Sequence, residues 1–377
     1  MRVPLSTDDL GLFFAQHHHQ LAAELRGVSL GLTTAIDSRG QHGISQELAQ
    51  SCDMLRWVTA ESGQTDVRAL CLIREMLGYV SPLADAVFAA SALGAFCLSQ
   101  VNRDGRWDDL LARYRTGDAV FGFALSEPEA GSDAASLQTR AVASTDGFKL
   151  SGVKTLISNA AIATHYVVFA TIDREKSHQG ITGFVVEATA PGVSVDPIRL
   201  NVDHPIGNVS VSDCVVGTDA VLGEVGSGFA LAMRVLDTFR PTVGAAAVGI
   251  ARRAFAEARA HVLDRVQFGK PLAATQLVQS QLADMATDLD AARLLVLRAA
   301  HARDHNEGTS TGAAMAKLFA TEAAQRIVDR AVQLHGGQGV VVGTVVEQLY
   351  RTVRPLRIYE GTSEIQRLII GRQVVRE

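Results

Sequence analysis

The chain has 377 residues, of which 47% are hydrophobic and only 6% aromatic, and its formal net charge is −5. This length predicts two or three domains with a large core, and the charge argues against a nucleic-acid partner. The four cysteines show no CxxC spacing, so we expect buried thiols of a reducing compartment and no disulfide framework. Neither a secretory signal nor a membrane-spanning apolar run is recognised, which predicts a cytoplasmic protein with no membrane partner.

Residues 1–120 predict an N-terminal helical domain. Apolar positions follow a helical period over 10–25, break at 37–40, resume over 44–58 and break again at 61–65. A nearly continuous apolar stretch over 67–98 contains Pro82, which predicts a kink or boundary. A short helix follows at 107–114. The run 17–19 is three histidines on a polar helix face without cysteine or acidic partners, so we favour no metal site there.

Residues 121–225 predict a middle domain built as an antiparallel β-barrel or sandwich. Its expected strands are short and β-branched, and Gly, Pro and Asp separate them, at 147–152, 164–170, 182–186, 193–195 and 209–211. An apolar run at 119–125 leads into a loop of small residues at 126–133. That loop is either an ordinary turn or a cradle whose N–H and hydroxyl groups hold the pyrophosphate of a cofactor.

Residues 226–377 predict a C-terminal four-helix bundle with a short last helix. In its first helix, Arg240 precedes Pro241, which indicates a polar site within close helix packing; an ion pair between Arg240 and Asp237 is the alternative. Farther on, Arg265 and Gln267 offer the donors that a pyrophosphate requires. The glycine-rich turn at 333–339 lacks GxGxxG order after a strand, so nicotinamide binding is not expected.

Near the end of the chain, Glu360 stands between Tyr359 and Gly361, just before an expected helix. Gly361 removes a Cβ where another molecule could approach, and Thr362 and Glu364 suit a helix N-terminus. The stretch 351–367 also contains four arginines. Two interpretations remain open: a carboxylate that caps a solvated turn, or a functional carboxylate in basic surroundings.

The run Tyr359-Glu360-Gly361-Thr362-Ser363-Glu364-Ile365-Gln366-Arg367 resembles the C-terminal signature of the acyl-CoA dehydrogenase family. Segments 126–133, 154–159, 265–272 and 333–339 resemble further family segments in the same order. The resemblance implies an α+β multidomain fold, an FAD cofactor and oxidation of an acyl thioester between Cα and Cβ. In many members of the family, the residue matching Glu360 removes the α-proton while a hydride leaves Cβ for flavin N5.

The same resemblance implies the other site residues. Leu156 replaces the usual Trp and Ser158 the usual Thr, which predicts that flavin still binds but with a more open face. The implied FAD contacts are Leu125, Ser126, Ser132, Leu156, Ile157, Ser158, Arg265, Gln267, Phe268, Gln276, Gln333, Gly336, Gly337, Thr362 and Glu364. The implied substrate contacts are Ser132, Asp237, Arg240 and Gly361.

The resemblance also implies a homodimer or homotetramer, in which Arg265, Gln267 and Gln333 reach the FAD of a neighbouring subunit, and an electron-accepting partner. It further implies a substrate that is an acyl thioester of CoA or of an acyl carrier protein. Family sequence is reduced to 61–63 in the N-terminal domain, and arginines stand at 234 and 240. We therefore favour a small polar acyl group on a carrier protein, as in polyketide or nonribosomal peptide biosynthesis. The alternatives are an ordinary short- or medium-chain acyl-CoA dehydrogenase and a flavin monooxygenase on the same fold.

Overall fold

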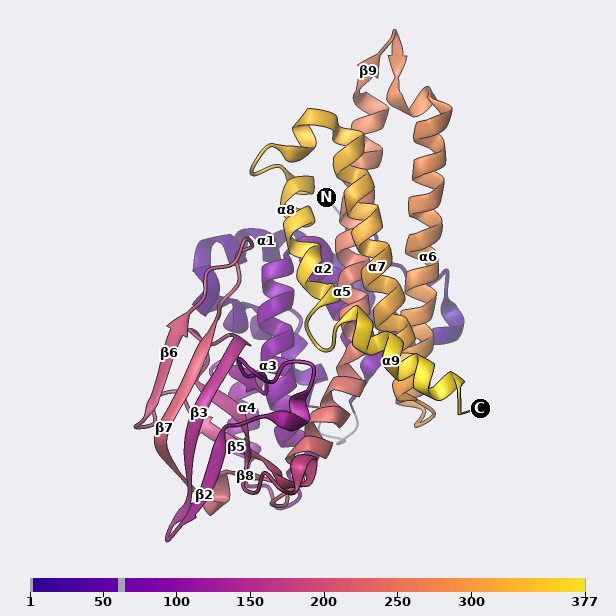
Figure 1. Ribbon diagram of the computed structural model, residues 1–377. Helices are drawn as coiled ribbons and strands as arrows, with labels where there is room; N and C mark the ends of the chain where they lie inside the picture. The colour runs from indigo at the N-terminus through magenta and orange to yellow at the C-terminus, as the bar shows by residue number, and fades with distance from the viewer. Residues whose placement is uncertain (1–2, 60–64, 377) are drawn as a thin grey trace. The chain divides into compact units, whose positions relative to one another are not determined.

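The computed structural model describes residues 3–59 and 65–376, whose elements are drawn in Figure 1. The chain divides into two compact units. Unit 1 comprises the described residues of Met1–Thr33, Val67–Asp85 and Asp237–Glu377, and unit 2 those of Thr34–Asp66 and Ala86–Leu236.

The helices are α1 (Gln16–Gln50), α2 (Val67–Val80), α3 (Pro82–Val101), α4 (Asp108–Arg115), α5 (Gly228–Asp264), α6 (Gln276–Asp304), α7 (Ser310–His335), α8 (Val345–Val353) and α9 (Ser363–Val374). The strands are β1 (Phe121–Ala124), β2 (Arg140–Ser144), β3 (Gly147–Ser158), β4 (His165–Thr171), β5 (Ile181–Glu187), β6 (Val193–Pro197), β7 (Ile206–Gly217), β8 (Val221–Leu222), β9 (Val266–Gln267) and β10 (Lys270–Pro271).

Unit 1 is helical, and small side chains let its helices approach closely. Alanine and valine dominate its core, with Ala246, Ala320 and Ala324 essentially inaccessible to solvent. A Cβ on Gly78 of α2 would lie 2.4 Å from the Ala246 carbonyl oxygen, and one on Gly249 of α5 would lie 2.1 Å from the Glu75 carbonyl oxygen. Glycine on both helices is therefore what allows α2 and α5 to pack together. Figure 1 shows α5, α6 and α7 side by side, with the β9–β10 hairpin projecting from one end.

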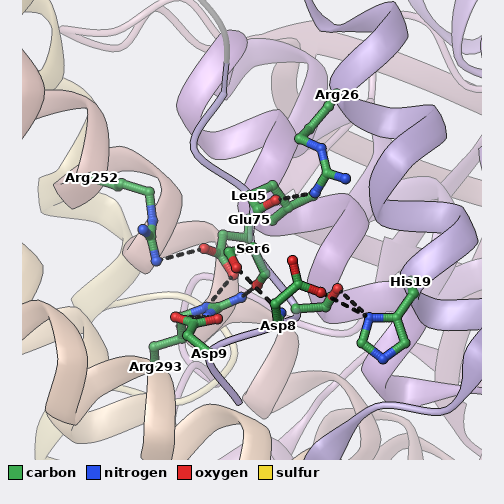
Figure 2. A network of polar contacts seen from close by, with 10 residues as sticks. Leu5, Ser6, Asp8, Asp9, His19, Arg26, Glu75, Arg252 and Arg293 are labelled. Atoms are coloured by element: carbon green, nitrogen blue, oxygen red, sulfur yellow. Dashed lines mark hydrogen bonds and ion pairs between the residues drawn. The ribbon is translucent and has the colours of Figure 1, made fainter. Parts of the chain in front are cut away.

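A charged network ties the N-terminal segment of unit 1 to three of its helices (Figure 2). The buried carboxylate of Glu75 on α2 lies 3.1 Å from Arg252 of α5 and 3.1 Å from Arg293 of α6. Arg293 also reaches Asp9 at 3.3 Å and donates to the carbonyl of Ser6. Removing one partner from such a buried cluster leaves an uncompensated charge, so the network holds α2 in register with α5 and α6.

The three histidines of α1 lie in this part of unit 1. The His18 Nδ1 accepts the Ala15 N–H at 2.9 Å, and the His19 Nδ1 lies 2.6 Å from the Thr7 Oγ1. These two rings therefore hold the start of α1 and the segment before it.

Unit 2 is built on one eight-stranded sheet in the order β6-β7-β3-β2-β4-β5-β8, with β1 paired to β4. Buried aliphatic and aromatic side chains such as Leu150, Tyr166, Val168 and Phe184 form its core. The predicted middle β domain is confirmed. Most pairings are antiparallel, but β1 runs parallel to β4, and β2 meets β4 in a parallel bridge. The Thr155 N–H of β3 donates to the carbonyl of Ser126, just after β1, at 2.9 Å, so the end of β1 lies beside β3.

Several expectations for the helices need correction. The break predicted at 37–40 is wrong, because α1 continues through it, whereas the boundary at Ser81-Pro82 separates α2 from α3 as predicted. The predicted break at 61–65 lies mostly outside the described residues. One helix of the described chain, α3, is long and apolar enough to cross a membrane by composition, contrary to the sequence expectation. Its apolar window is 78% buried, as in a core helix.

Candidate active site

Glu360 lies in unit 1 on a short loop between a 3-10 turn, Arg354–Arg357, and helix α9. Pro355 stands in the first turn of the 3-10 segment, and its carbonyl accepts the N–H groups of Ile358 at 2.8 Å and Tyr359 at 3.1 Å. On the other side, the Thr362 hydroxyl caps α9 by accepting the Ile365 N–H at 3.3 Å, as predicted. The sequence thus ends one helix and starts the next within a few residues of Glu360.

The backbone of this loop is left-handed at two consecutive residues, with φ +52° at Glu360 and +91° at Gly361. A Cβ on Gly361 would lie 2.7 Å from the Gln366 Nε2, so both the conformation and the space require glycine. A glutamate pays roughly 1–2 kcal/mol for this conformation, and strain of this kind concentrates at functional sites. The geometry therefore favours a functional carboxylate over a simple cap.

Glu322 of α7 holds the loop from both sides. Its carboxylate accepts hydrogen bonds from the Arg357 Nε at 2.9 Å, before Glu360, and from the Ser363 Oγ at 2.6 Å, after it. These hydrogen bonds outweigh the effect of burial and keep the pKa of Glu322 below its ordinary value. Glu322 therefore remains ionised, and the loop is anchored to α7 at both ends.

The Glu360 carboxylate is partly buried, and its Oε2 atom is inaccessible with no hydrogen-bond partner among the described residues. Burial raises the pKa of Glu360 above its ordinary value. The positive charges of Arg74, Lys317 and Arg240 oppose this shift, and the negative charge of Asp85 adds to it. A carboxylate with a raised pKa and an oxygen that accepts no hydrogen bond is suited to accept a proton.

Arg74 of α2 is the first of these cations, and it is completely buried. It donates two hydrogen bonds to Asp85, from Nε at 2.8 Å and from Nη2 at 2.9 Å, and a third from Nη1 to the Thr242 hydroxyl at 2.9 Å. Charge partners of this kind raise the pKa of the guanidinium despite the opposing effect of burial. A fixed ion pair is thus part of the electrostatic environment of Glu360.

Arg240, on α5, makes the close ion pair with Asp237 that the sequence offered as an alternative. Its positive charge also counteracts the rise in the pKa of Glu360 that burial causes. Arg240 therefore belongs to a polar site and forms the ion pair at the same time. Its Nε atom is buried without a hydrogen-bond partner among the described residues. Asp237 accepts a further bond from the Ser310 hydroxyl.

In unit 2, two residues predicted to contact flavin, Leu125 and Ser126, follow β1. The buried Lys154 of β3 supports this turn, because its Nζ donates to the Leu125 carbonyl at 3.1 Å and to the Glu127 carboxylate at 2.7 Å. Burial lowers the pKa of Lys154 to about 8. The Ser126 carbonyl accepts the Thr155 N–H at 2.9 Å, whereas no hydrogen bond within the described residues uses the Ser126 N–H.

The β3 segment brings three further predicted residues beside this turn. Leu156 has a left-handed φ of +55° and an exposed side chain, whereas Ile157 is buried in the core of the sheet. The Ser158 hydroxyl lies 2.8 Å from the Nε2 atom of His204. Ser132, predicted for phosphate or substrate, is exposed on its loop.

A third group of predicted residues gathers at one end of the helices of unit 1. The predicted residues around the β9–β10 hairpin and those at and just after the end of α7 are exposed. Phe268 is 100% exposed and has a left-handed φ of +51°. Exposure on this scale is unusual for an aromatic side chain. The exposed members are Arg265, Gln267, Phe268, Gln276, Gln333, Gly336 and Gly337.

Several residues that build the site were not singled out from the sequence. The clearest missed signals are charges within apolar helical runs, namely Arg74 in 69–80 and Lys317 in 313–320. Each is buried and would be destabilising without a partner, which is a reason to look for one. Glu322, Gln366 and His204 carry no comparable signal, because their partners are set by tertiary contacts.

Comparison with known proteins agrees with this geometry. Residues 226–375 match the acyl-CoA dehydrogenase C-terminal domain, and residues 122–214 match the acyl-CoA dehydrogenase middle domain. The chain is 38% identical over 317 residues to the 3-(aryl)acrylate reductase of Clostridium sporogenes, covering 82% of this chain and 84% of that protein. It is 42% identical over 267 residues to the human mitochondrial short-chain specific acyl-CoA dehydrogenase, covering 70% and 65%.

Among solved structures, the butyryl-CoA dehydrogenase of Megasphaera elsdenii matches with a TM-score of 0.89 at 30% identity, over 96% of this chain and 99% of that one. The fold and the site therefore define a flavoprotein oxidoreductase that acts on CH–CH bonds. The chain belongs to the acyl-CoA dehydrogenase family, and its cofactor is FAD.

The residues present fit this cofactor. The Ser126 N–H, which no hydrogen bond among the described residues uses, and the Ser158 hydroxyl offer polar contacts for a flavin ring, and the exposed side chain of Leu156 offers an apolar one. Arg265 and Gln267 offer exposed donors for a pyrophosphate.

Proposed function

We propose that the chain oxidises a small polar acyl group carried as a thioester on an acyl carrier protein, with Glu360 as the base that removes the α-proton. FAD, when bound, supplies the acceptor for the hydride that leaves Cβ. The observation that carries the base assignment is the left-handed, partly buried Glu360, whose Oε2 has no partner among the described residues. The negative charge that develops on the thioester oxygen must be stabilised by a hydrogen-bond donor. The Glu360 N–H is suited to that role, because it donates to no acceptor among the described residues.

The charges around Glu360 support a polar acyl group. Within unit 1, Arg74, Asp85, Arg240 and Lys317 all act on this carboxylate. A long alkyl tail gains its binding energy by burial against apolar surface, and a charged environment does not provide that surface. The buried Nε of Arg240, which has no hydrogen-bond partner among the described residues, is the donor that a hydroxyl or carboxyl substituent on the acyl group would use.

Exposed arginines near the loop support delivery by a carrier protein. Arg354 and Arg367 flank the Glu360 loop and are exposed, in a chain whose net charge is −5. Carrier proteins are usually acidic, and complementary charge speeds their association. Polyketide or nonribosomal peptide biosynthesis is the setting that we propose for such a substrate, in the cytoplasm and with a separate electron acceptor.

An ordinary short-chain acyl-CoA dehydrogenase is the second candidate, and the 42% identity to the human short-chain enzyme favours it. The deciding experiment is anaerobic reduction of the bound flavin by butyryl-CoA, octanoyl-CoA and small hydroxy- or aminoacyl carrier proteins. We expect the carrier-protein thioesters to bleach the flavin faster. Bleaching by the CoA esters alone would contradict the proposal.

Charge-reversal variants distinguish binding of the carrier protein from the oxidation of the acyl group. Replacing Arg354 and Arg367 by Glu should raise KM for the carrier-protein substrate by about tenfold and leave free CoA thioesters unaffected, because each exposed charge contributes up to about 1 kcal/mol. Lys149→Glu, on an exposed position of β3, is the control and should change neither.

We propose further that the chain is a homo-oligomer, in which the end of unit 1 that carries the β9–β10 hairpin packs against another copy of the chain. The exposed apolar side chains there include Val266, Phe268, Leu277, Val340 and Val342. Several large apolar side chains this exposed at one end of the helices favour burial against another chain. Phe268→Asp should lower both the oligomer mass and the FAD content; a variant with unchanged mass by light scattering would count against the idea.

The monooxygenase alternative predicts oxygen and NADPH consumption without a thioester. Glu360 argues against it, because the oxygenation of a substrate by a reduced flavin needs no strained carboxylate poised to remove an α-proton. Measuring aerobic NADPH oxidation with and without thioester distinguishes the two.

A further inference from the structure

The three carbonyl groups around Glu360 are all held by two buried side chains. The Lys317 Nζ of α7 donates to the Tyr359 carbonyl at 2.7 Å and to the Gly361 carbonyl at 2.5 Å. The Gln366 Nε2 of α9 donates to the Glu360 carbonyl at 3.3 Å and to the Gly361 carbonyl at 2.8 Å. Lys317 is only 1% exposed and Gln366 is fully buried, so neither is a surface contact that water could replace.

The contact to the Tyr359 carbonyl also fixes a donor. No cis peptide bond occurs in the described chain, and in a trans peptide the carbonyl oxygen and the next N–H point in opposite directions. Because Lys317 draws the Tyr359 oxygen toward α7, the Glu360 N–H must point away from α7. One lysine therefore determines the direction of the backbone donor next to the base.

The same contacts explain how the strained loop persists. A left-handed glutamate followed by a left-handed glycine is not a conformation that a free loop would keep. The Gln366 Nε2 lies only 2.7 Å from the position that a Cβ on Gly361 would occupy. The contacts of Gln366 with the loop are therefore possible only because residue 361 is a glycine.

We propose that Lys317 and Gln366 are positioning residues that clamp the Glu360 loop and aim both the carboxylate and the N–H of Glu360 at the substrate. This inference rests on the proposed role of Glu360 as the base. Misplacing a catalytic group by about 1 Å can cost on the order of 10²-fold in rate, so a loss of the clamp should appear in chemistry rather than in substrate affinity.

Lys317 also acts on the charge of Glu360. Burial lowers the pKa of Lys317 to about 8, against the raising effect of the Glu360 charge. The charged and titratable groups that face Glu360 are Arg74 from α2, Asp85 from α3, Arg240 from α5 and Lys317 from α7, with Tyr359 beside it. Of these, Lys317 alone also holds the loop backbone, so its removal should both release the loop and raise the pKa of Glu360 further.

The test compares Lys317→Met, Lys317→Arg and Gln366→Met with wild type as FAD-loaded proteins. The first readout is amide hydrogen exchange of the peptide that spans 355–368, which does not depend on activity. We expect Lys317→Met and Gln366→Met to speed this exchange by at least about tenfold, and exchange in α6 to stay unchanged, because only the loop loses its hydrogen bonds. Lys149→Met is the matched control on an exposed lysine.

The second readout is the pH dependence of flavin reduction by the best thioester. Because the base must be ionised, the rate falls as the pH drops through the pKa of Glu360; Lys317→Met should move this acid limb to higher pH and slow the plateau rate by about 10–100-fold. Lys317→Arg keeps a charge and donors and should recover most of both effects.

Unchanged hydrogen exchange in both Lys317→Met and Gln366→Met would overturn the proposal. A rate of flavin reduction as low in Lys317→Arg as in Lys317→Met would also overturn it. If Lys317→Met does not fold, Gln366→Met carries the exchange test alone. If no thioester reduces the wild-type flavin, the proposed function fails, whereas the exchange result still decides whether the clamp exists.

Discussion

Breaking the buried ion pair between Arg74 and Asp85 should destabilise the protein strongly. Asp85→Asn keeps the size of the side chain but leaves the guanidinium of Arg74, which is 0% exposed, without its charge partner. Two hydrogen bonds at 2.8 and 2.9 Å lose their ionic character, and only the Thr242 hydroxyl remains as a full-strength partner. Removing one member of a buried pair costs about 3–5 kcal/mol.

The assay is the thermal unfolding of the FAD-loaded protein, followed by circular dichroism. A loss of that size should lower the melting temperature by roughly 10 °C in a unit of about 150–250 residues. The double variant Arg74→Met/Asp85→Leu removes both charges and should recover most of the loss, since apolar replacements of buried pairs are often neutral. A drop of less than about 2 °C for Asp85→Asn, or a double variant worse than the single one, would refute the reasoning.

Three further predictions test the site residue by residue. Gly361→Ala should destabilise the Glu360 loop by about 1–2 kcal/mol and slow flavin reduction, because the new Cβ meets the Gln366 amide at φ +91°; a stopped-flow rate within twofold of wild type would contradict this. Lys154→Met should weaken FAD binding by about tenfold, because the turn at Leu125 loses its buried donor; titration of apoprotein with FAD measures it, and an unchanged dissociation constant would remove Lys154 from the flavin site. Leu156→Trp should tighten FAD binding by several-fold, because an indole adds a flat contact worth about 1 kcal/mol; the same titration checks it, and weaker binding would mean that the exposed position does not face the flavin.

The loop around Glu360 is the part of the site that the sequence predicted best. The cap residue is a local feature, and the structure places Thr362 at the N-cap of α9 as expected, whereas Gly361 is required by its left-handed φ and by the Gln366 side chain. Lys317 and Arg74 could not be assigned in advance, because a single charge in an apolar helix indicates only that some partner exists. Which carbonyl or carboxylate it meets depends on how α2, α5 and α7 pack.

The errors in the fold have equally local causes. The predicted break at 37–40 relied on the stretch Asp37-Ser38-Arg39-Gly40, but even its glycine costs only about 1 kcal/mol in a helix, and tertiary context overrides such a preference. Strand β2 was missed because four of its five residues are exposed, so it shows no apolar alternation. The parallel pairing of β1 with β4 depends on the sheet order, which a set of short β-branched runs does not specify.

The central claim is that Glu360 removes the α-proton of an acyl thioester. Anaerobic stopped-flow reduction of the bound flavin, by the best thioester of the panel above, tests it in wild type and in Glu360→Gln. The amide has the same size but cannot accept a proton, so the account predicts an unchanged flavin spectrum and a rate at least about 10²-fold lower. A rate within about twofold of wild type would contradict it and assign Glu360 to the cap of α9 alone.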